Sequence, residues 1–291
     1  RNRAIVDVFE PGSTVKPLLV ADALEIGLYR ASTRIDTEGG QYKVGSLTVR
    51  DSHPRGVLDM AGILTHSSNV GAAKIGLTLG PEAVWNVLQR FGLNEPVHSG
   101  FPGEADGVFR HFEEWGQIAT ATASYGYGLS VNALQLVRAY AALANDGLMP
   151  TLTLTPRTEP AEQRRVLSAA VARDVRQMME SVVSVDGTAV KAAIPGYRVT
   201  GKTGTVRKVS GSGGYHDDRH QAVFIGMVPA ADARLVGLVM IDEPGNKVYY
   251  GGLVAAPVFS SVMRAAVRLL KIAPDVRPAD VQAQVKTQVP T

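Results

Sequence analysis

Hydrophobic residues recur at helical spacing through the segment STVKPLLVADALEIG, which runs from Ser13 to Gly27. Pro17 fits a helix only in the first turn, where its missing N–H takes no part in the hydrogen-bond ladder. The sequence therefore predicts a helix that begins at Ser13 and is entered through a turn formed by Pro11 and Gly12.

The rest of the chain alternates helical and strand-like patterns. The middle third predicts short helices across residues 57–93, broken at 66–69 and at Gly80-Pro81, followed by a longer helix. The last third predicts a helix, three strands and a final helix, with a glycine-rich run at 210–214 between the first two strands. The longer helices are expected at 133–144, 166–183 and 255–270, and the strands at 197–203, 222–228 and 234–241.

The composition of the chain excludes several classes of protein. With 291 residues and 45% hydrophobic content, the chain can bury a sizeable core. A net charge of +3 with scattered basic residues is no signature of nucleic-acid binding, and no window is apolar enough for a membrane span. The absence of cysteine excludes disulfides and thiolate catalysis.

The histidines show no spacing typical of a metal site. The densest cluster, residues 216–220, is interpreted as a solvated loop that includes His220. We therefore expect neither a metal ion nor another cofactor.

One motif, GYRVTGKT at residues 196–203, matches the phosphate-binding loop of nucleotide hydrolases. The strand that ends in Asp242-Glu243 would then supply a magnesium ligand. A phosphate-binding loop must lead directly into a helix, because the helix N-terminus holds the phosphates. The residues after Thr203 favour a strand, so we treat this motif as the least favoured alternative.

A second set of motifs occurs in the order Ser13-Thr14-Val15-Lys16, Ser67-Ser68-Asn69 and Lys202-Thr203-Gly204. The first motif opens a helix, the second lies in a break between helices, and the third runs along a predicted strand. Three residues along a helix place Lys16 on the same face as Ser13. The set is similar to the signature of class A β-lactamases and penicillin-binding proteins, except that Ser68 stands where that pattern has Asp, which disfavours a class A β-lactamase. Ser130-Val131-Asn132 is interpreted as a helix start.

Along nearly its whole length the chain resembles the class B penicillin-binding proteins, and most closely their cell-division members. The resemblance is carried by the three motifs together with DVFEPGSTVKP, SSNVG, QRFGL, FPGE, SYGYGLSVN, QLVRAYAALANDG and GGLVAAPVF. It implies an α/β (α+β) penicillin-binding transpeptidase or serine β-lactamase-like fold over residues 1–291. In that fold an antiparallel sheet is flanked by helices, and a helical lobe occupies approximately residues 50–150.

The resemblance also implies the roles of individual residues. Ser13 would attack the penultimate D-Ala carbonyl of a peptidoglycan stem peptide, and Lys16 would take the proton of its hydroxyl. Burial and the charge of Lys202 would lower the pKa of Lys16, so that it can act as this base. Ser67 would relay a proton to the leaving D-Ala, and Asn69 would hold the substrate's amide side chain. The backbone amides of Ser13 and Thr205 would bind the oxyanion. The expected carboxylate-binding residues are Lys202, Thr203, Gly204, Thr205 and Arg207, and the expected aromatic walls are Tyr127, Tyr215, Tyr249 and Tyr250.

The expected setting follows from the same resemblance. The domain would form septal cross-links, be acylated by β-lactams, and face the periplasm from the bacterial inner membrane. A single N-terminal anchor and a pedestal domain would lie outside this sequence, together with contacts to a septal glycosyltransferase and other division proteins. His220 stands where a tyrosine is expected. A β-lactam sensor or scaffold domain and an elongation-type transpeptidase remain alternatives, whereas a carboxypeptidase or β-lactamase is less favoured because no motif for a deacylating base is found.

Overall fold

The computed structural model describes residues 1–156, 158–159, 162–211, 213–245 and 248–276. The chain forms two compact units, 1–175 (unit 1) and 176–291 (unit 2). The last part of the predicted domain, residues 277–291, lies outside the described residues. Among the described residues, no helix is both long enough and apolar enough to cross a membrane.

Unit 1 is built around the helix α2, Lys16–Glu25. Every residue of α2 from Lys16 to Ala23 is buried, as expected for a helix that is covered on all sides. The buried carboxylate of Asp22 on α2 forms an ion pair with Arg90. The other helices lying wholly in unit 1 are α1 (Arg3–Val6), α3 (Met60–Thr65), α4 (Asn69–Leu79), α5 (Pro81–Arg90), α6 (Gln117–Ala123) and α7 (Ala133–Ala144).

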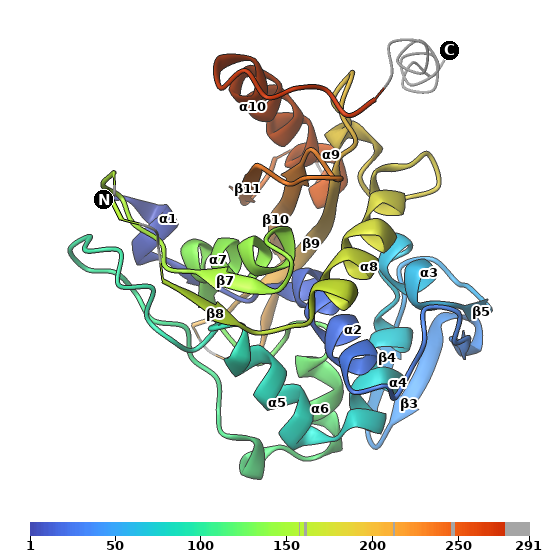
Figure 1. The fold of residues 1–291 in the computed structure, drawn as a ribbon. Coiled ribbons are helices and arrows are strands. Elements are labelled where there is room, and N and C mark those ends of the chain that lie inside the picture. Colours follow the sequence, from blue (N-terminus) through green and yellow to red (C-terminus); the bar gives the residue numbers. More distant parts are fainter. Residues whose placement is uncertain (157, 160–161, 212, 246–247, 277–291) are drawn as a thin grey trace. The chain divides into compact units, whose positions relative to one another are not determined.

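The described strands of unit 1 pair two by two in antiparallel ladders. The longest ladder is the hairpin of β3 and β4, in which Gln41 pairs with Arg50 and Val44 pairs with Leu47. This hairpin packs beside α4 (Figure 1). The pairs are β1 (Val8–Phe9) with β6 (Val131–Asn132), β2 (Ile35–Asp36) with β5 (Val57–Leu58), β3 (Gln41–Val44) with β4 (Leu47–Arg50), and β7 (Leu148–Pro150) with β8 (Gln163–Arg165).

Unit 2 contains an antiparallel sheet in the order β11-β10-β9. Because β10 is the central strand, its residues 222–228 are buried, and α9 and α10 pack against the sheet (Figure 1). The boundary between the units falls within α8, Ala169–Glu180. The other elements of the sheet region are β9 (Thr200–Val209), β10 (Tyr215–Val228), β11 (Leu235–Asp242), α9 (Gly251–Val254) and α10 (Ala256–Leu269).

Most predicted elements are confirmed within a few residues, but three details differ. The α-helix begins at Lys16 and not at Ser13, because residues 12–15 form a tighter 3₁₀ turn. The strand β9 starts at Thr200 and continues to Val209, so no helix follows Lys202 and the phosphate-loop alternative is wrong. Residues 216–220 lie in β10 and not in a loop, since His220 pairs with Arg207 on β9.

Candidate active site

The candidate nucleophile, Ser13, lies in the 3₁₀ turn that leads into α2. The turn is entered through Gly12, whose φ of 53° favours glycine, and it closes with a hydrogen bond from the Lys16 amide to the Ser13 carbonyl. In a 3₁₀ turn, residues three apart lie on the same side. Ser13 is half-buried and Lys16 is fully buried, so the turn places a reachable hydroxyl one turn before a buried amino group.

Two contacts within unit 1 hold this turn in place. The buried Tyr140 of α7 donates a 2.8 Å hydrogen bond from its hydroxyl to the Thr14 carbonyl. Gly126, in the SYGYG segment, accepts a 3.0 Å bond from the Gly12 amide, and a Cβ at Gly126 would lie 2.1 Å from the Gly12 carbonyl oxygen. Only glycine therefore fits at position 126, and the backbone before Ser13 is fixed by this close approach.

Lys16 joins the first motif to the second. Its Nζ donates to the Ser67 carbonyl oxygen at 2.6 Å and to the Asn69 Oδ1 at 2.7 Å, and it lies 3.4 Å from the Ser67 Oγ. Ser67 has a φ of 56°, which is rare for a residue with a side chain and is typical of functional sites. Within unit 1 the structure therefore brings together Lys16 of the first motif with Ser67 and Asn69 of the second.

Asp51 organises the second motif, and sequence reasoning missed it. One carboxylate oxygen accepts from the amides of Asn69, at 2.5 Å, and Val70, at 2.9 Å. The other accepts from the Ser68 hydroxyl at 2.7 Å, while the Asn69 side-chain amide donates to the Arg50 carbonyl at 2.9 Å. A carboxylate at the start of α4 satisfies free amides and favours the helix dipole. No local pattern identifies it, because Asp51 lies 17 to 19 residues before its partners.

The third motif lies on β9 of unit 2. Lys202 is fully buried, and this burial lowers the pKa of its ammonium group to about 7. Its Nζ lies 3.2 Å from the Thr203 carbonyl oxygen, and the Thr203 hydroxyl is 2.9 Å from that of Thr188. The Thr205 hydroxyl accepts a 3.1 Å bond from the Gly251 amide, which ties β9 to the start of α9.

Of the four tyrosines expected in aromatic walls, two form a stack. The Tyr249 ring lies nearly parallel to that of His220, at a centroid distance of 4.0 Å, and stacks at an angle of 29° on that of Tyr250, at 4.8 Å. The hydrogen bond that the Tyr250 hydroxyl donates to the Tyr249 side chain, together with desolvation, raises the pKa of Tyr250. Tyr127 instead packs edge-on against Tyr125 in unit 1. Tyr215 is exposed at the start of β10.

Arg207, expected near the substrate carboxylate, is exposed on β9. Its guanidinium lies 3.2 Å from the carboxylate of Asp217 on the neighbouring strand β10. An exposed pair of this kind holds the side chain only weakly.

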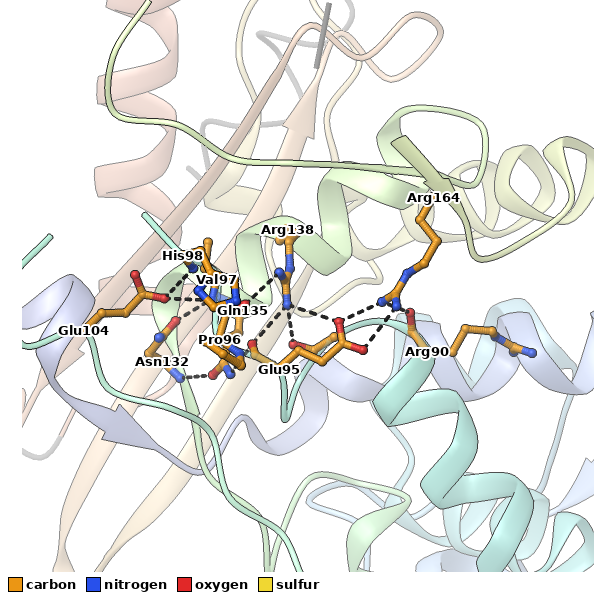
Figure 2. A network of polar contacts seen from close by, with 11 residues as sticks. Arg90, Glu95, Pro96, Val97, His98, Glu104, Asn132, Gln135, Arg138 and Arg164 are labelled. Carbon is orange, nitrogen blue, oxygen red and sulfur yellow. Dashed lines mark hydrogen bonds and ion pairs between the residues drawn. The ribbon is translucent and has the colours of Figure 1, made fainter. Parts of the chain in front are cut away.

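A polar network in unit 1 supports α7 and the segment before it. The buried Arg138 of α7 donates to the backbone carbonyls of Gly92, Glu95 and Pro96. Figure 2 labels Arg138, Glu95 and Pro96. Arg164 binds both carboxylate oxygens of Glu95, at 3.2 and 2.9 Å. Because α7 also carries Tyr140, this network helps to hold the turn that contains Ser13.

The segment before α7 also contains Glu104, which binds residues 97–99 (Figure 2). Its carboxylate accepts the backbone amides of Val97, His98 and Ser99 and the Ser99 hydroxyl, at 2.5 to 3.0 Å. Although desolvation opposes the shift, these hydrogen bonds lower the pKa of Glu104. Asn132, predicted as part of a helix start, caps α7 in a reciprocal capping box with Gln135, which confirms that prediction.

The fold and the three motifs are of the penicillin-binding type. A family model described as the penicillin binding protein transpeptidase domain matches residues 1–264, and the chain belongs to this family. A solved transpeptidase domain of penicillin-binding protein 3 from Burkholderia pseudomallei is 42% identical. It superposes with a TM-score of 0.90 over 95% of this chain and 84% of that one. These findings confirm the predicted fold class and the resemblance to this family.

Named relatives agree with this assignment. The probable peptidoglycan D,D-transpeptidase PbpC of Pseudomonas aeruginosa is 42% identical over 275 residues, which cover 94% of this chain and 48% of that protein. The peptidoglycan D,D-transpeptidase FtsI of Escherichia coli is 40% identical over 275 residues, which cover 94% of this chain and 46% of FtsI. The chain thus spans about half the length of these relatives.

Proposed function

We propose that this chain is the catalytic domain of a peptidoglycan D,D-transpeptidase that forms an acyl-enzyme on Ser13. The hydroxyl oxygen attacks the penultimate D-Ala carbonyl of a stem peptide, and the terminal D-Ala leaves as an amine. An amine of a second stem peptide then attacks the ester, which frees Ser13 and completes the cross-link. The observation that carries the proposal is the contact of the buried Lys16 Nζ with both Ser67 and Asn69, one turn after Ser13.

Lys16 acts as the base in its neutral form. A neutral amine has two N–H donors and one lone pair, and the short contacts to the Ser67 carbonyl and the Asn69 amide oxygen match the two donors. The lone pair then accepts the Ser13 proton as the oxygen attacks. The Ser67 hydroxyl, 3.4 Å from the same nitrogen, passes that proton to the leaving amine. Asn69 also holds the substrate's amide side chain.

The third motif binds the charged groups of the substrate. The ammonium form of Lys202 and the hydroxyls of Thr203 and Thr205 bind the terminal carboxylate, with Gly204 allowing close approach and Arg207 adding positive charge. The backbone amides of Ser13 and Thr205 stabilise the oxyanion, and one such donor contributes about 2.7–4 kcal/mol to catalysis. Tyr127, Tyr215, Tyr249 and Tyr250 form apolar walls for the substrate and for β-lactams.

The cellular role is proposed from the family. The resemblance to the cell-division members of the family supports a role in septal wall synthesis, with the domain at the periplasmic face of the inner membrane and a single N-terminal anchor. One relative is a peptidoglycan D,D-transpeptidase named FtsI. A septal glycosyltransferase and other division proteins are the proposed partners, through parts of the protein outside this chain. No metal or other cofactor takes part in the proposed reaction.

The test is intact mass after incubation with benzylpenicillin, followed by peptide mapping. We expect one drug adduct on Ser13 that is absent in Ser13→Ala. No adduct on the folded protein, or an adduct on another residue, would overturn the assignment. Turnover of a thioester that mimics acyl-D-Ala, with transfer to an added amine, distinguishes a transpeptidase from a sensor or scaffold, which would be acylated without turnover.

A further inference from the structure

A cavity of about 560 Å³ lies in unit 1, apart from the three motifs. Its walls come from the tip of the β3–β4 hairpin, the end of α4 at Leu77, the start of α5 at Pro81, and the segment that leads into α6. The volume is within the range of about 300–1,000 Å³ that is typical of ligand sites. The cavity is therefore large enough for a ligand of more than one ring.

The walls combine aromatic rings with an amide and a lysine side chain. Tyr42 and Trp115 supply the rings, and the ammonium group of Lys74 lies 4.8 Å from the Tyr42 centroid. Gln117 and Lys43 are exposed, and within the described chain neither side chain has a hydrogen-bond or ion-pair partner. Among the described residues that line the cavity, none is acidic.

This combination suits a carbohydrate. The electron-rich faces of aromatic rings attract the C–H faces of a sugar ring, and amide and ammonium groups bind hydroxyl and acetamido oxygens. Carboxylates are absent from the described walls, so the acidic groups carried by a peptidoglycan unit meet no like charge there.

The distance from the second motif to the cavity matches the length of a short extended peptide. The helix α4 begins at Asn69 and reaches the cavity eight residues later at Leu77, which is about 12 Å at the helical rise of 1.5 Å per residue. The β3–β4 hairpin also runs from the second motif to the cavity. The Arg50 carbonyl at its base accepts a hydrogen bond from the Asn69 side-chain amide, and Gly45 at its tip lines the cavity. An extended peptide of four residues spans about 13–14 Å.

We infer that this cavity binds the N-acetylated amino-sugar strand to which the stem peptide is attached, while the peptide's reactive end lies at Ser13 and Asn69. The inference rests on the proposed function and adds a site for the glycan part of the same substrate. It assigns Trp115 and Gln117 as sugar-binding residues and Lys43 as a donor to sugar oxygens.

The experiment titrates the protein with the N-acetylglucosamine tetramer, which carries no peptide, and follows backbone amide shifts by NMR and affinity by calorimetry. We expect shifts confined to residues 42–45, Leu77 and residues 115–120, which line the cavity. The double variant Lys43→Ala, Gln117→Ala should weaken binding about three- to tenfold. Both side chains are exposed, and so are those of the matched control Lys191→Ala, Gln163→Ala, which should bind as the parent does.

Acylation by benzylpenicillin, which has no sugar, separates this inference from the proposed function. We expect an unchanged acylation rate on Ser13 in all variants. Absence of tetramer binding, or binding that the pocket variant leaves unchanged, overturns the glycan site even if acylation is intact. A stem peptide without sugar that binds at residues 42–45 and loses affinity in Lys43→Ala also overturns it, in favour of an acidic-peptide site.

Discussion

Asp51 provides the sharpest test of how the second motif is held. In Asp51→Asn, the amide oxygen can still accept from Asn69 and Val70, but the other oxygen that accepts from the Ser68 hydroxyl becomes a donor. The negative charge at the start of α4 is also lost. A charge-assisted hydrogen bond contributes about 1.5–3 kcal/mol and the helix dipole about 0.3–1 kcal/mol, so we expect a loss of about 2–4 kcal/mol in the free energy of unfolding.

The same variant should slow acylation, because Asn69 and Ser67 contact Lys16. A loss of about 1.4 kcal/mol in the transition state lowers the second-order rate constant about tenfold. The assays are urea unfolding and the rate of acylation by a fluorescent penicillin at a temperature where the variant stays folded. Asp36→Asn is the matched control, since Asp36 also accepts a backbone amide, that of Glu38, but does not contact the motif. An acylation rate equal to that of the parent in folded Asp51→Asn would refute the positioning role.

Three further predictions follow from buried contacts. Arg138→Met should lower the free energy of unfolding, measured in urea, by about 2–4 kcal/mol, because it leaves buried carbonyls without donors. Arg164→Met breaks an exposed ion pair and should lower it by less than about 1 kcal/mol. Equal losses would contradict the importance of burial. Gly126→Ala should slow penicillin acylation at least about tenfold, because the added Cβ overlaps the backbone before Ser13. Gly128→Ala is the control and should leave the acylation rate unchanged, because Gly128 also has a positive φ but an added Cβ meets no atom of the described structure within 4 Å. The ammonium form of Lys202 is lost as pH rises through about 7, so kcat/KM for a carboxylate-bearing thioester should fall on that alkaline side, and a substrate without the carboxylate should show no such fall.

The elements and the motifs could be predicted from local patterns. The spacing of apolar residues predicted α4, α5, α7 and β11 within a few residues, because each element buries one face at its own period. The strand β9 continues six residues past its predicted end, and β10 begins seven residues before its predicted start. The first helix was predicted three residues too early, since Ser13 to Val15 have helical side-chain spacing but Gly12 turns the backbone into a tighter 3₁₀ turn. The position of His220 in β10 was missed because the polar run 216–220 continues a strand beyond its buried part.

The sequence by itself determined the three motifs, their order and the residue types that the chemistry requires, since serine, lysine and asparagine carry their chemistry wherever they stand. Only the tertiary structure decided which groups hold them. Asp51 contacts the second motif from 17 residues away, Tyr140 contacts the turn of Ser13 from 126 residues away, and Lys16 reaches Asn69 across 53 residues. Such contacts depend on how helices and strands pack, so the pattern of residues that are close in sequence does not predict which distant atom a side chain will contact.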